Sequence, residues 1–240
     1  MNKSSSFFIS LAALVLSIAA LTMCLLCCNK AKTNNVEEAL MAKPEMVVEA
    51  IKKYEQNMRE QAEAEAQKLV QAHIEELQND AATPFIGPEN AKVTVVEFFD
   101  YSCGYCHRLF PELKTVIEAN PDVKFVFKPL TFLGEVSNVA AKASLAAGKQ
   151  GKFAQMHNAL FGTSERLTQE KIRAIAEEQG LDMSKYDADI ASEEITNFLN
   201  ATSALANSIQ VNGVPVLFVN GKMLQTLDGK DIQASINENK

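Results

Sequence analysis

Lys92-Val-Thr-Val-Val-Glu-Phe-Phe-Asp-Tyr-Ser-Cys-Gly-Tyr-Cys-His107 is the stretch of sequence that decides the fold. Its first half, Lys92–Phe99, is rich in β-branched and aromatic residues. Apolar side chains occupy both odd and even positions and would face both sides of a sheet, which predicts a buried central strand. A helix is expected from Cys103 to about residue 119, and another strand at Val123–Lys128. The succession of strand, helix and strand predicts a βαβ unit with a right-handed crossover.

The two cysteines of this stretch, Cys103 and Cys106, form a C-x-x-C motif at the start of the expected helix. Unpaired N–H groups and the helix dipole stabilise a thiolate at a helix N-terminus, so Cys103 is the candidate nucleophile. The three-residue spacing places Cys106 one turn further along, within disulfide reach but shielded. The motif therefore predicts dithiol–disulfide chemistry, with Cys106 as the resolving thiol.

Other chemistries use the same pattern of cysteines. A zinc site needs further ligands, and the domain has no second cysteine pair and only scattered histidines, so zinc is discounted. Cys103-x-x-Cys106-His107 also matches the attachment pattern of a c-type haem. A non-catalytic protein that binds haem or copper through these cysteines therefore stays open as the alternative. Cys24 and Cys27 repeat the spacing, but they lie in an apolar run and are interpreted as small apolar residues.

The β pattern returns after a long helical block. Residues 136–209 are expected to be helical almost throughout. Val214–Val219 then predicts a strand, Asn220-Gly221 a two-residue hairpin turn, and Lys222–Leu224 the returning strand, before a closing helix. Pro215, at the head of an apolar strand, is either an ordinary turn proline or a cis-proline that faces the disulfide.

The first 82 residues precede the expected globular domain, 83–240. Residues 1–30 contain an uncharged apolar run, which predicts a signal peptide or a membrane anchor, and therefore export. Residues 31–82 predict a helical oligomerisation segment with a linker. The apolar stripe of this helix, which one small domain cannot cover, comprises Val47, Ile51, Tyr54 and Met58.

Composition excludes several classes of protein. The chain is 47% hydrophobic and 22% charged, with 10 Gly and 7 Pro, which is a globular profile. Its net charge of −7 offers no basic surface for a phosphate backbone, so no nucleic-acid partner is expected. Five cysteines are too few for a disulfide scaffold.

Taken together, these motifs resemble the DsbA family of thiol:disulfide oxidoreductases over roughly residues 86–240. The matching motifs are Glu97-Phe-Phe, Cys103-x-x-Cys106 and Val214-Pro215-x-x-Phe218-Val-Asn-Gly221. The resemblance implies an α/β thioredoxin fold with an inserted helical domain at about 136–209. It also implies that Pro215 is the cis-proline of that fold.

The resemblance assigns roles within the site as well. Glu97 matches a buried acid beneath the dithiol, which could relay a proton to or from Cys106, and Lys128 matches the basic partner of that acid. Gly104-Tyr105 between the cysteines resembles a disulfide isomerase, whereas Val214 before the cis-proline resembles the oxidases. The two markers disagree, so the direction of electron flow stays open.

The prediction is a periplasmic thiol:disulfide interchange protein that forms or isomerises disulfides in exported proteins. Client proteins would pair an extended backbone beside Val214 and Pro215. A membrane redox partner is expected, and no metal or organic cofactor is needed. Residues 36–79 resemble the N-terminal helix of a longer subfamily that dimerises, so a homodimer through this segment is expected.

Overall fold

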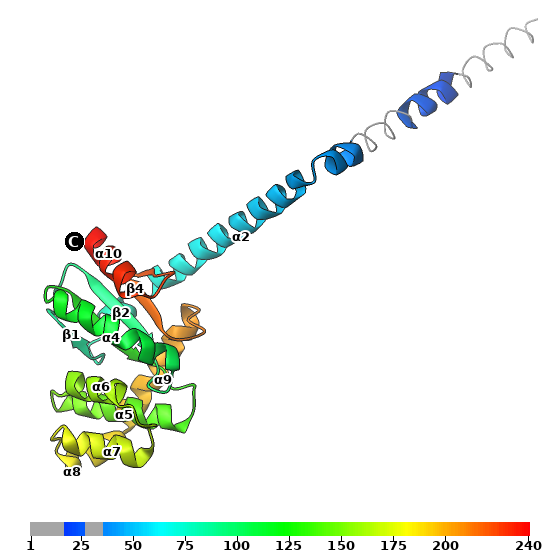
Figure 1. Cartoon of the computed structure of the whole chain (residues 1–240). Helices are drawn as coiled ribbons and strands as arrows, with labels where there is room; N and C mark the ends of the chain where they lie inside the picture. The colour runs from blue at the N-terminus through cyan, green and yellow to red at the C-terminus, as the bar shows by residue number, and fades with distance from the viewer. Residues whose placement is uncertain (1–16, 27–35) are drawn as a thin grey trace, which may run out of the picture. The chain divides into compact units, whose positions relative to one another are not determined.

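The chain divides into two compact units, Met1–Ala62 and Glu63–Lys240. The computed structural model describes residues 17–26 and 36–240, drawn as the coloured ribbon in Figure 1. Residues 17–26 are helical, and the rest of the predicted signal or anchor segment, 1–30, lies outside the described residues. No helix in the described ranges is long and apolar enough to cross a membrane.

A five-stranded mixed sheet forms the centre of the second unit, in the order β1-β3-β2-β4-β5. The central strand β2 runs parallel to β3 and antiparallel to β4. Helix α4 (Gly104–Ala119) joins β2 to β3 and completes the predicted βαβ unit. This topology is that of the expected thioredoxin fold, and the strands are β1 (Phe85–Ile86), β2 (Thr94–Phe99), β3 (Lys124–Pro129), β4 (Val216–Val219) and β5 (Lys222–Met223).

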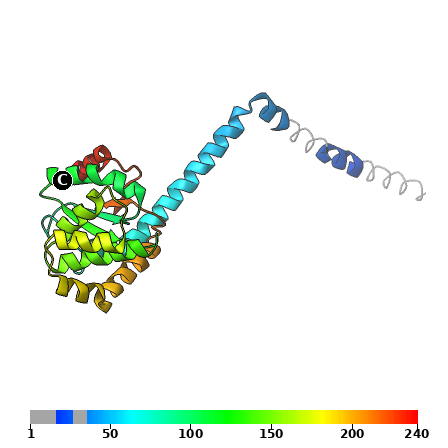
Figure 2. The ribbon, with the colours of Figure 1, turned by 60° about the horizontal axis from the view of Figure 1, so that its bottom comes forward.

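Five helices lie between β3 and β4, over residues 135–208, where a helical insertion at about 136–209 was expected. Helices α5 to α8 pack on one another and lie together in both ribbon views (Figures 1 and 2). Thr168, Asp182 and Ser192 accept backbone N–H groups at the starts of three of these helices, as N-cap residues do. The five helices are α5 (Glu135–Lys149), α6 (Phe153–Gly162), α7 (Gln169–Glu178), α8 (Met183–Ile190) and α9 (Glu193–Ser208).

Strand β2 is buried on both faces of the sheet, because its alternate side chains enter two hydrophobic clusters. Val95 and Phe99 belong to the cluster that α4, the insertion and α10 (Gly229–Asn239) cover. Val96 and Phe98 belong to the cluster on the opposite face. The position of a side chain along β2 therefore decides on which face it acts.

The N-terminal segment differs from the prediction in where it ends. Residues 36–42 are helical, and α2 (Glu45–Ala72) and α3 (Ile74–Gln78) follow. Val70 and Leu77 are buried in the second cluster, and the Gln67 side chain donates to the Gly221 carbonyl at 3.0 Å. The compact domain consequently begins at Glu63 and not at residue 83.

A short edge strand was not predicted. Phe85–Ile86, at the start of the expected domain, forms β1 and pairs antiparallel with β3. Gly87 ends this strand with a φ of 102°, and a Cβ there would lie 2.0 Å from the Val123 carbonyl oxygen. Only glycine fits that position, which fixes the close approach of β1 to the start of β3.

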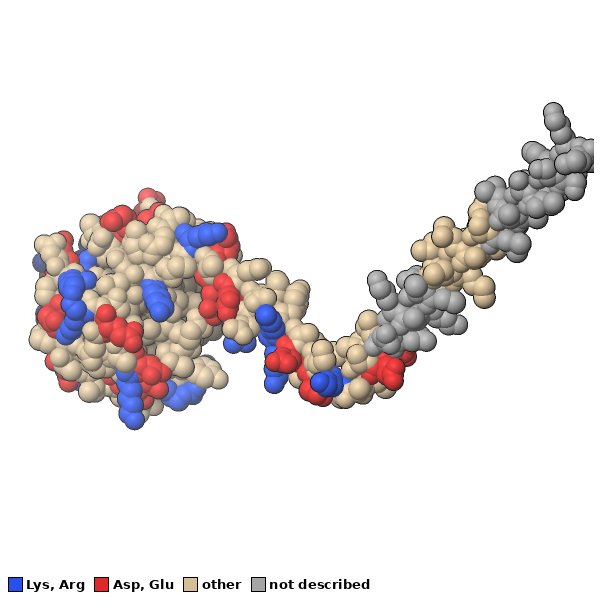
Figure 3. Space-filling model, turned by 90° about the horizontal axis from the view of Figure 1, so that it is seen from above, with Lys and Arg blue, Asp and Glu red and all other residues tan. Residues whose placement is uncertain are grey.

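The surface of the domain carries charges of both signs. On the face shown in Figure 3, the Lys and Arg side chains are interspersed with Asp and Glu over the globular part. A mixed surface of this kind provides no continuous positive field on that face.

Candidate active site

Cys103 is the N-cap residue of α4, with an extended backbone (φ −82°, ψ 116°). Its side chain is 7% exposed, and its Sγ donates to the Val214 carbonyl oxygen at 3.5 Å. The Cys103 N–H donates to the Asp100 carbonyl at 3.0 Å, which closes the turn between β2 and the helix. The sulfur therefore lies at the end of a 16-residue helix, where unpaired N–H groups favour an anion.

The peptide bond between Val214 and Pro215 is cis, as predicted. It leads into β4, in which Val216 pairs with Phe98 of β2. Since β2 ends where the dithiol turn begins, and the antiparallel β4 begins beside that end, the sheet brings Val214 next to Cys103. The proline loop and the cysteine motif, separated by more than a hundred residues, thus form one site.

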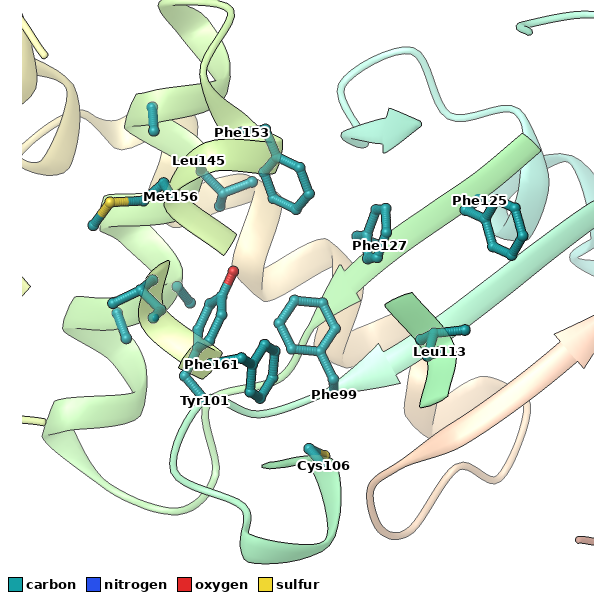
Figure 4. Close-up of a cluster of buried hydrophobic side chains, with 14 of the residues drawn as sticks. Phe99, Tyr101, Cys106, Leu113, Phe125, Phe127, Leu145, Phe153, Met156 and Phe161 are labelled. Carbon is teal, nitrogen blue, oxygen red and sulfur yellow. The ribbon is translucent and has the colours of Figure 1, made fainter. Parts of the chain in front are cut away.

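Cys106 is fully buried one turn into α4, and both thiols are free. Figure 4 shows Cys106 near Phe99, at the border of the aromatic cluster. Burial raises the pKa of the Cys106 thiol, and the nearby Glu97 raises it further. The two cysteines therefore differ in the way that an attacking and a resolving thiol should differ.

Glu97 lies in the middle of β2, opposite Phe127 on one side and Leu217 on the other. It is 4% exposed, and its Oε2 has no hydrogen-bond partner among the described residues. Burial raises the pKa of Glu97 to about 8, because a carboxylate loses its hydration there. At neutral pH this carboxyl is mostly protonated, and it lies close enough to Cys106 to influence the pKa of that thiol.

The predicted pairing of Glu97 with Lys128 is wrong. In the β2–β3 register Lys128 lies beside Phe98, so it projects to the opposite face of the sheet from Glu97. Lys128 is 1% exposed, and its Nζ donates to the Glu76 carbonyl and the Thr83 hydroxyl, both at 2.8 Å, and contacts Asp80 at 3.5 Å. Lys128 therefore holds α3 and the following loop against the sheet face that is opposite the dithiol helix.

The two residues between the cysteines face outward. Tyr105 is 69% exposed, and the Arg108 guanidinium lies 4.1 Å from the centre of its ring. A Cβ added to Gly104 would meet no atom within 4 Å. These positions leave the surface above Cys103 open to a large partner, as a protein client would require.

Asp100 is a site residue that the sequence interpretation missed. It is fully buried, and its Oδ1 accepts the Ser102 N–H at 2.8 Å while Oδ2 accepts the Leu133 N–H at 3.4 Å. An Asp directly after a strand, two residues before a free N–H, is an Asx-turn signal that could have identified it.

His107 does not face an open coordination site. Its ring nitrogens lie 2.8 Å from the Tyr101 carbonyl and 3.3 Å from the Phe161 carbonyl. In the described part of the chain, no three His, Cys, Asp or Glu side chains come together as metal ligands would.

Similar proteins were found by sequence and by structure. The chain is 30% identical to the thiol:disulfide interchange protein DsbA of Haemophilus influenzae, over 56% of this chain and 69% of that one. It is 31% identical to the Na(+)/H(+) antiporter NhaA 3 of Salinispora tropica, over 57% of this chain. The match spans only 21% of the antiporter.

Two crystal structures resemble the domain. One is a thioredoxin-like oxidoreductase from Silicibacter pomeroyi, with 35% identity and a TM-score of 0.65 over 68% of this chain and 95% of that one. The other is a periplasmic thioredoxin-like protein from Salmonella enterica serovar Typhimurium, with 27% identity and a TM-score of 0.61 over 69% and 94%.

The family model of the DsbA-like thioredoxin domain matches residues 94–238, from the start of β2 to the end of α10. That range includes the dithiol turn, the helical insertion and the cis-proline loop. The chain therefore belongs to the DSBA-like thioredoxin domain family.

Proposed function

We propose that this protein exchanges disulfide bonds with exported proteins through Cys103 and Cys106. The contact between Cys103 Sγ and the Val214 carbonyl supports this most directly, because it places one thiol at a helix N-terminus beside a strand edge. The buried Cys106 is one turn away. Attack through a mixed disulfide needs a nucleophilic sulfur and a second, resolving sulfur close behind it.

Both directions of exchange follow the same steps. In oxidation, a client thiolate attacks Cys103 of the disulfide and Cys106 leaves; a second client thiol then displaces Cys103, which completes the client disulfide. In isomerisation, the Cys103 thiolate attacks a client disulfide, and a different client thiol later displaces it. Electrons balance in each case, since one disulfide is consumed for each one formed.

Glu97 is proposed to donate a proton to Cys106 and to accept it back. When Cys106 leaves the disulfide as a thiolate in a buried position, it needs a proton, and the protonated carboxyl of Glu97 is suited to supply one. The direction reverses when the disulfide forms again. Lys128 has no part in this step, because it lies on the other face of the sheet.

Clients are proposed to bind along the cis-proline loop. The half-buried Val214 and Pro215 lie at the start of β4 beside Cys103, and Tyr105 offers an exposed aromatic ring between the two cysteines. A client segment could add main-chain hydrogen bonds at this edge while its cysteine reaches Cys103. Because main-chain hydrogen bonds do not depend on the side chains of the client, many different client proteins could bind in this way.

The periplasm is the proposed location. The apolar run at Phe7–Cys28 would direct export, and an oxidising compartment lets protein disulfides persist. A membrane redox partner would return the dithiol to its working state, and no metal or organic cofactor is required. Direct measurement of the mature N-terminus tests whether this run is cleaved or kept as an anchor.

Self-association is proposed through the helix that precedes the domain. Val47, Ile51, Tyr54 and Met58 are 42–65% exposed in the single chain. A second copy would cover this stripe, and a dimer is the smallest assembly that does so. The segment available for pairing is 36–62, because residues 63–79 belong to the compact domain.

Trapping of mixed disulfides tests the proposed function. The reduced Cys106→Ser variant should accumulate covalent adducts with client proteins that contain a disulfide. The Cys103 thiolate attacks that disulfide and one client sulfur leaves as a thiolate, but no Cys106 thiol is present to release the client from Cys103. Cys103→Ser is the matched control and should trap nothing. Equal trapping by both variants, or none by either, would contradict the assigned roles. A Soret band or bound copper in the purified protein would favour the non-catalytic alternative.

A further inference from the structure

A cavity of about 420 Å³ lies beside the residues that precede the dithiol. Tyr101 and Ser102, directly before Cys103, form one of its walls, and residues 133–136 and 165–167 form the others. The second of these walls leads into α5, and the third lies between α6 and α7. The cavity therefore lies between the cysteine motif and the helical insertion, and its volume is within the range of about 300–1,000 Å³ that is usual for ligand pockets.

Hydrogen bonds hold the walls of this cavity together. The Asp100 carboxyl accepts the Leu133 N–H at 3.4 Å, and the Ser137 hydroxyl donates to the Ser102 hydroxyl at 2.9 Å. Gly134, in the wall between these contacts, has a φ of 123°, although a Cβ there would meet no atom within 4 Å. Backbone conformation, and not lack of space, therefore favours glycine at this position. The wall is thus fixed to the residues before the dithiol by the fold itself.

Three charged side chains line the cavity, and two of them are already balanced. The Glu165 carboxylate pairs with Lys171 Nζ at 2.8 Å. Glu135 lies in the first turn of α5, where the helix N-terminus favours a negative charge. Arg166 is exposed, and it makes no ion pair or hydrogen bond within the part of the chain that the structure describes. Its guanidinium therefore still has N–H donors to offer to a ligand.

We propose that Arg166 makes this cavity a client subsite, which binds an acidic side chain of the client protein. A guanidinium binds a carboxylate through two parallel hydrogen bonds, which provide both affinity and orientation. The inference deepens the proposed thiol–disulfide exchange and rests on it. Arg166 contacts the client and not the reacting sulfurs, so it determines specificity and takes no part in the chemistry.

The place of the cavity suits a client that is bonded to Cys103. Ser102 lines the cavity and adjoins Cys103 in the chain, so the cavity is close to the point at which the client cysteine is attached. An extended client segment advances about 3.3 Å per residue, so a side chain within a few residues of that cysteine can reach the cavity. Main-chain contacts beside Val214 accept any sequence. The cavity adds a preference for one type of side chain.

Reduction of symmetrical peptide disulfides by the reduced full chain tests this preference. The Cys103 thiolate attacks one peptide sulfur and the other peptide leaves as a thiolate; Cys106 then displaces the bonded peptide, so the protein gains one disulfide and the peptides lose one. The peptides carry Glu, Gln or Lys at one of the three positions on either side of their cysteine. At one or more of these positions, Glu should lower the half-saturating concentration about fivefold relative to Gln, and Lys should raise it, at an unchanged limiting rate.

Reversal of the charge separates recognition from packing. Arg166→Gln should remove the difference between the Glu and Gln peptides, and Arg166→Glu should make Lys the preferred residue at the same position. A reversed preference cannot arise from a misfolded variant. Arg173→Gln is the matched control, because the Arg173 guanidinium donates to the Asp187 carboxylate at 3.1 Å, and it should keep the order of the unaltered protein. Added salt should reduce the preference for Glu.

Three results would overturn the subsite. They are equal half-saturation for all peptides at every position, a Glu preference that survives in the Arg166→Gln variant, and a preference for Lys in the unaltered protein, which would assign the cavity to Glu135.

An uncharged small disulfide, 2-hydroxyethyl disulfide, distinguishes failure of the subsite from failure of the proposed function. The unaltered protein and every Arg166 variant should reduce it at the same rate, because it has no charge for Arg166 to bind. If the unaltered protein does not reduce it, the proposed exchange itself is wrong. If it is reduced but the peptides are not distinguished, only the subsite is wrong.

Discussion

Glu97 and Lys128 lie on neighbouring strands but project to opposite faces of the same sheet. The acid faces the dithiol helix, and the base faces α3. Two buried ionisable groups that could pair on one face therefore have separate surroundings. Burial keeps the Glu97 carboxyl mostly protonated at neutral pH, while the Lys128 ammonium group has three oxygen partners.

The first prediction concerns pH and Glu97. The unfolded chain loses this proton near pH 4.5 and the folded chain near pH 8, so the free energy of unfolding should fall as pH rises through that window. The total effect is at most a few kcal/mol. Glu97→Gln should flatten the dependence, measured by urea unfolding of both proteins between pH 5 and pH 8. The contribution of the buried His157 is present in both proteins and cancels in the comparison. An unchanged slope would refute the buried, protonated carboxyl.

The second prediction separates Lys128 from the chemistry. Lys128→Met removes three hydrogen bonds and leaves the Glu76 carbonyl and the Thr83 hydroxyl without their donor. We expect the free energy of unfolding to fall by about 1–3 kcal/mol. The rate of exchange with a small disulfide should stay that of the unaltered protein, whereas Glu97→Gln should slow it. A slower exchange with the small disulfide in a folded Lys128 variant would show that Lys128 takes part in the chemistry after all.

The third prediction places the boundary of the domain. Leu77 is fully buried against the back of the sheet, so Leu77→Ala should cost about 2–5 kcal/mol of stability, measured by chemical denaturation. Val48→Ala is the matched control, because Val48 is 53% exposed and lies outside the stripe, and it should change the stability of the domain by less than about 0.5 kcal/mol. Similar effects at both positions would argue against a boundary at Glu63.

The fourth prediction links self-association to the repair of wrong disulfides. Deleting residues 31–62 should give a monomer in light scattering that still oxidises dithiols but loses most repair of scrambled disulfides, because one site alone cannot hold a misfolded client. Ile51→Glu with Tyr54→Glu in the full chain should have the same effect without a deletion. A deletion through residue 79 is unsuitable, since it would also remove Val70 and Leu77 from the core.

Two results would contradict this link. If the full chain is a monomer, the exposed stripe has another purpose. If the monomeric deletion variant repairs scrambled disulfides as well as the full chain does, self-association is unnecessary for isomerisation.

Local pattern was sufficient for much of the site. Cys103 and Cys106 could be placed because a strand, a turn and a helix follow one another within a single stretch. The cis bond at Pro215 was expected from its position at a strand head together with the family resemblance. The fold class followed from the order of these elements and from the family resemblance. In each case the deciding residues are neighbours in the sequence.

The pairing of distant elements could not be predicted from the sequence. The face on which Lys128 lies depends on its pairing with Phe98, which no single strand sequence contains. Gln67 looked like part of a solvated helix, yet it contacts Gly221, 154 positions away. His107 has no distinctive pattern, because its partner Phe161 lies in another element.

The packing of Val70 and Leu77 on the sheet has a consequence for biosynthesis. These residues leave the ribosome early. Their packing partners in α9, and Gly221, which contacts Gln67 of α2, are synthesised much later. The sheet face that Val70 and Leu77 cover therefore stays exposed until almost the whole chain has been synthesised. Contacts between residues so far apart in the sequence also form slowly. During that interval its apolar strands are open to association with other nascent chains, so maturation of this protein should depend on assistance that keeps the unfinished chain apart from others.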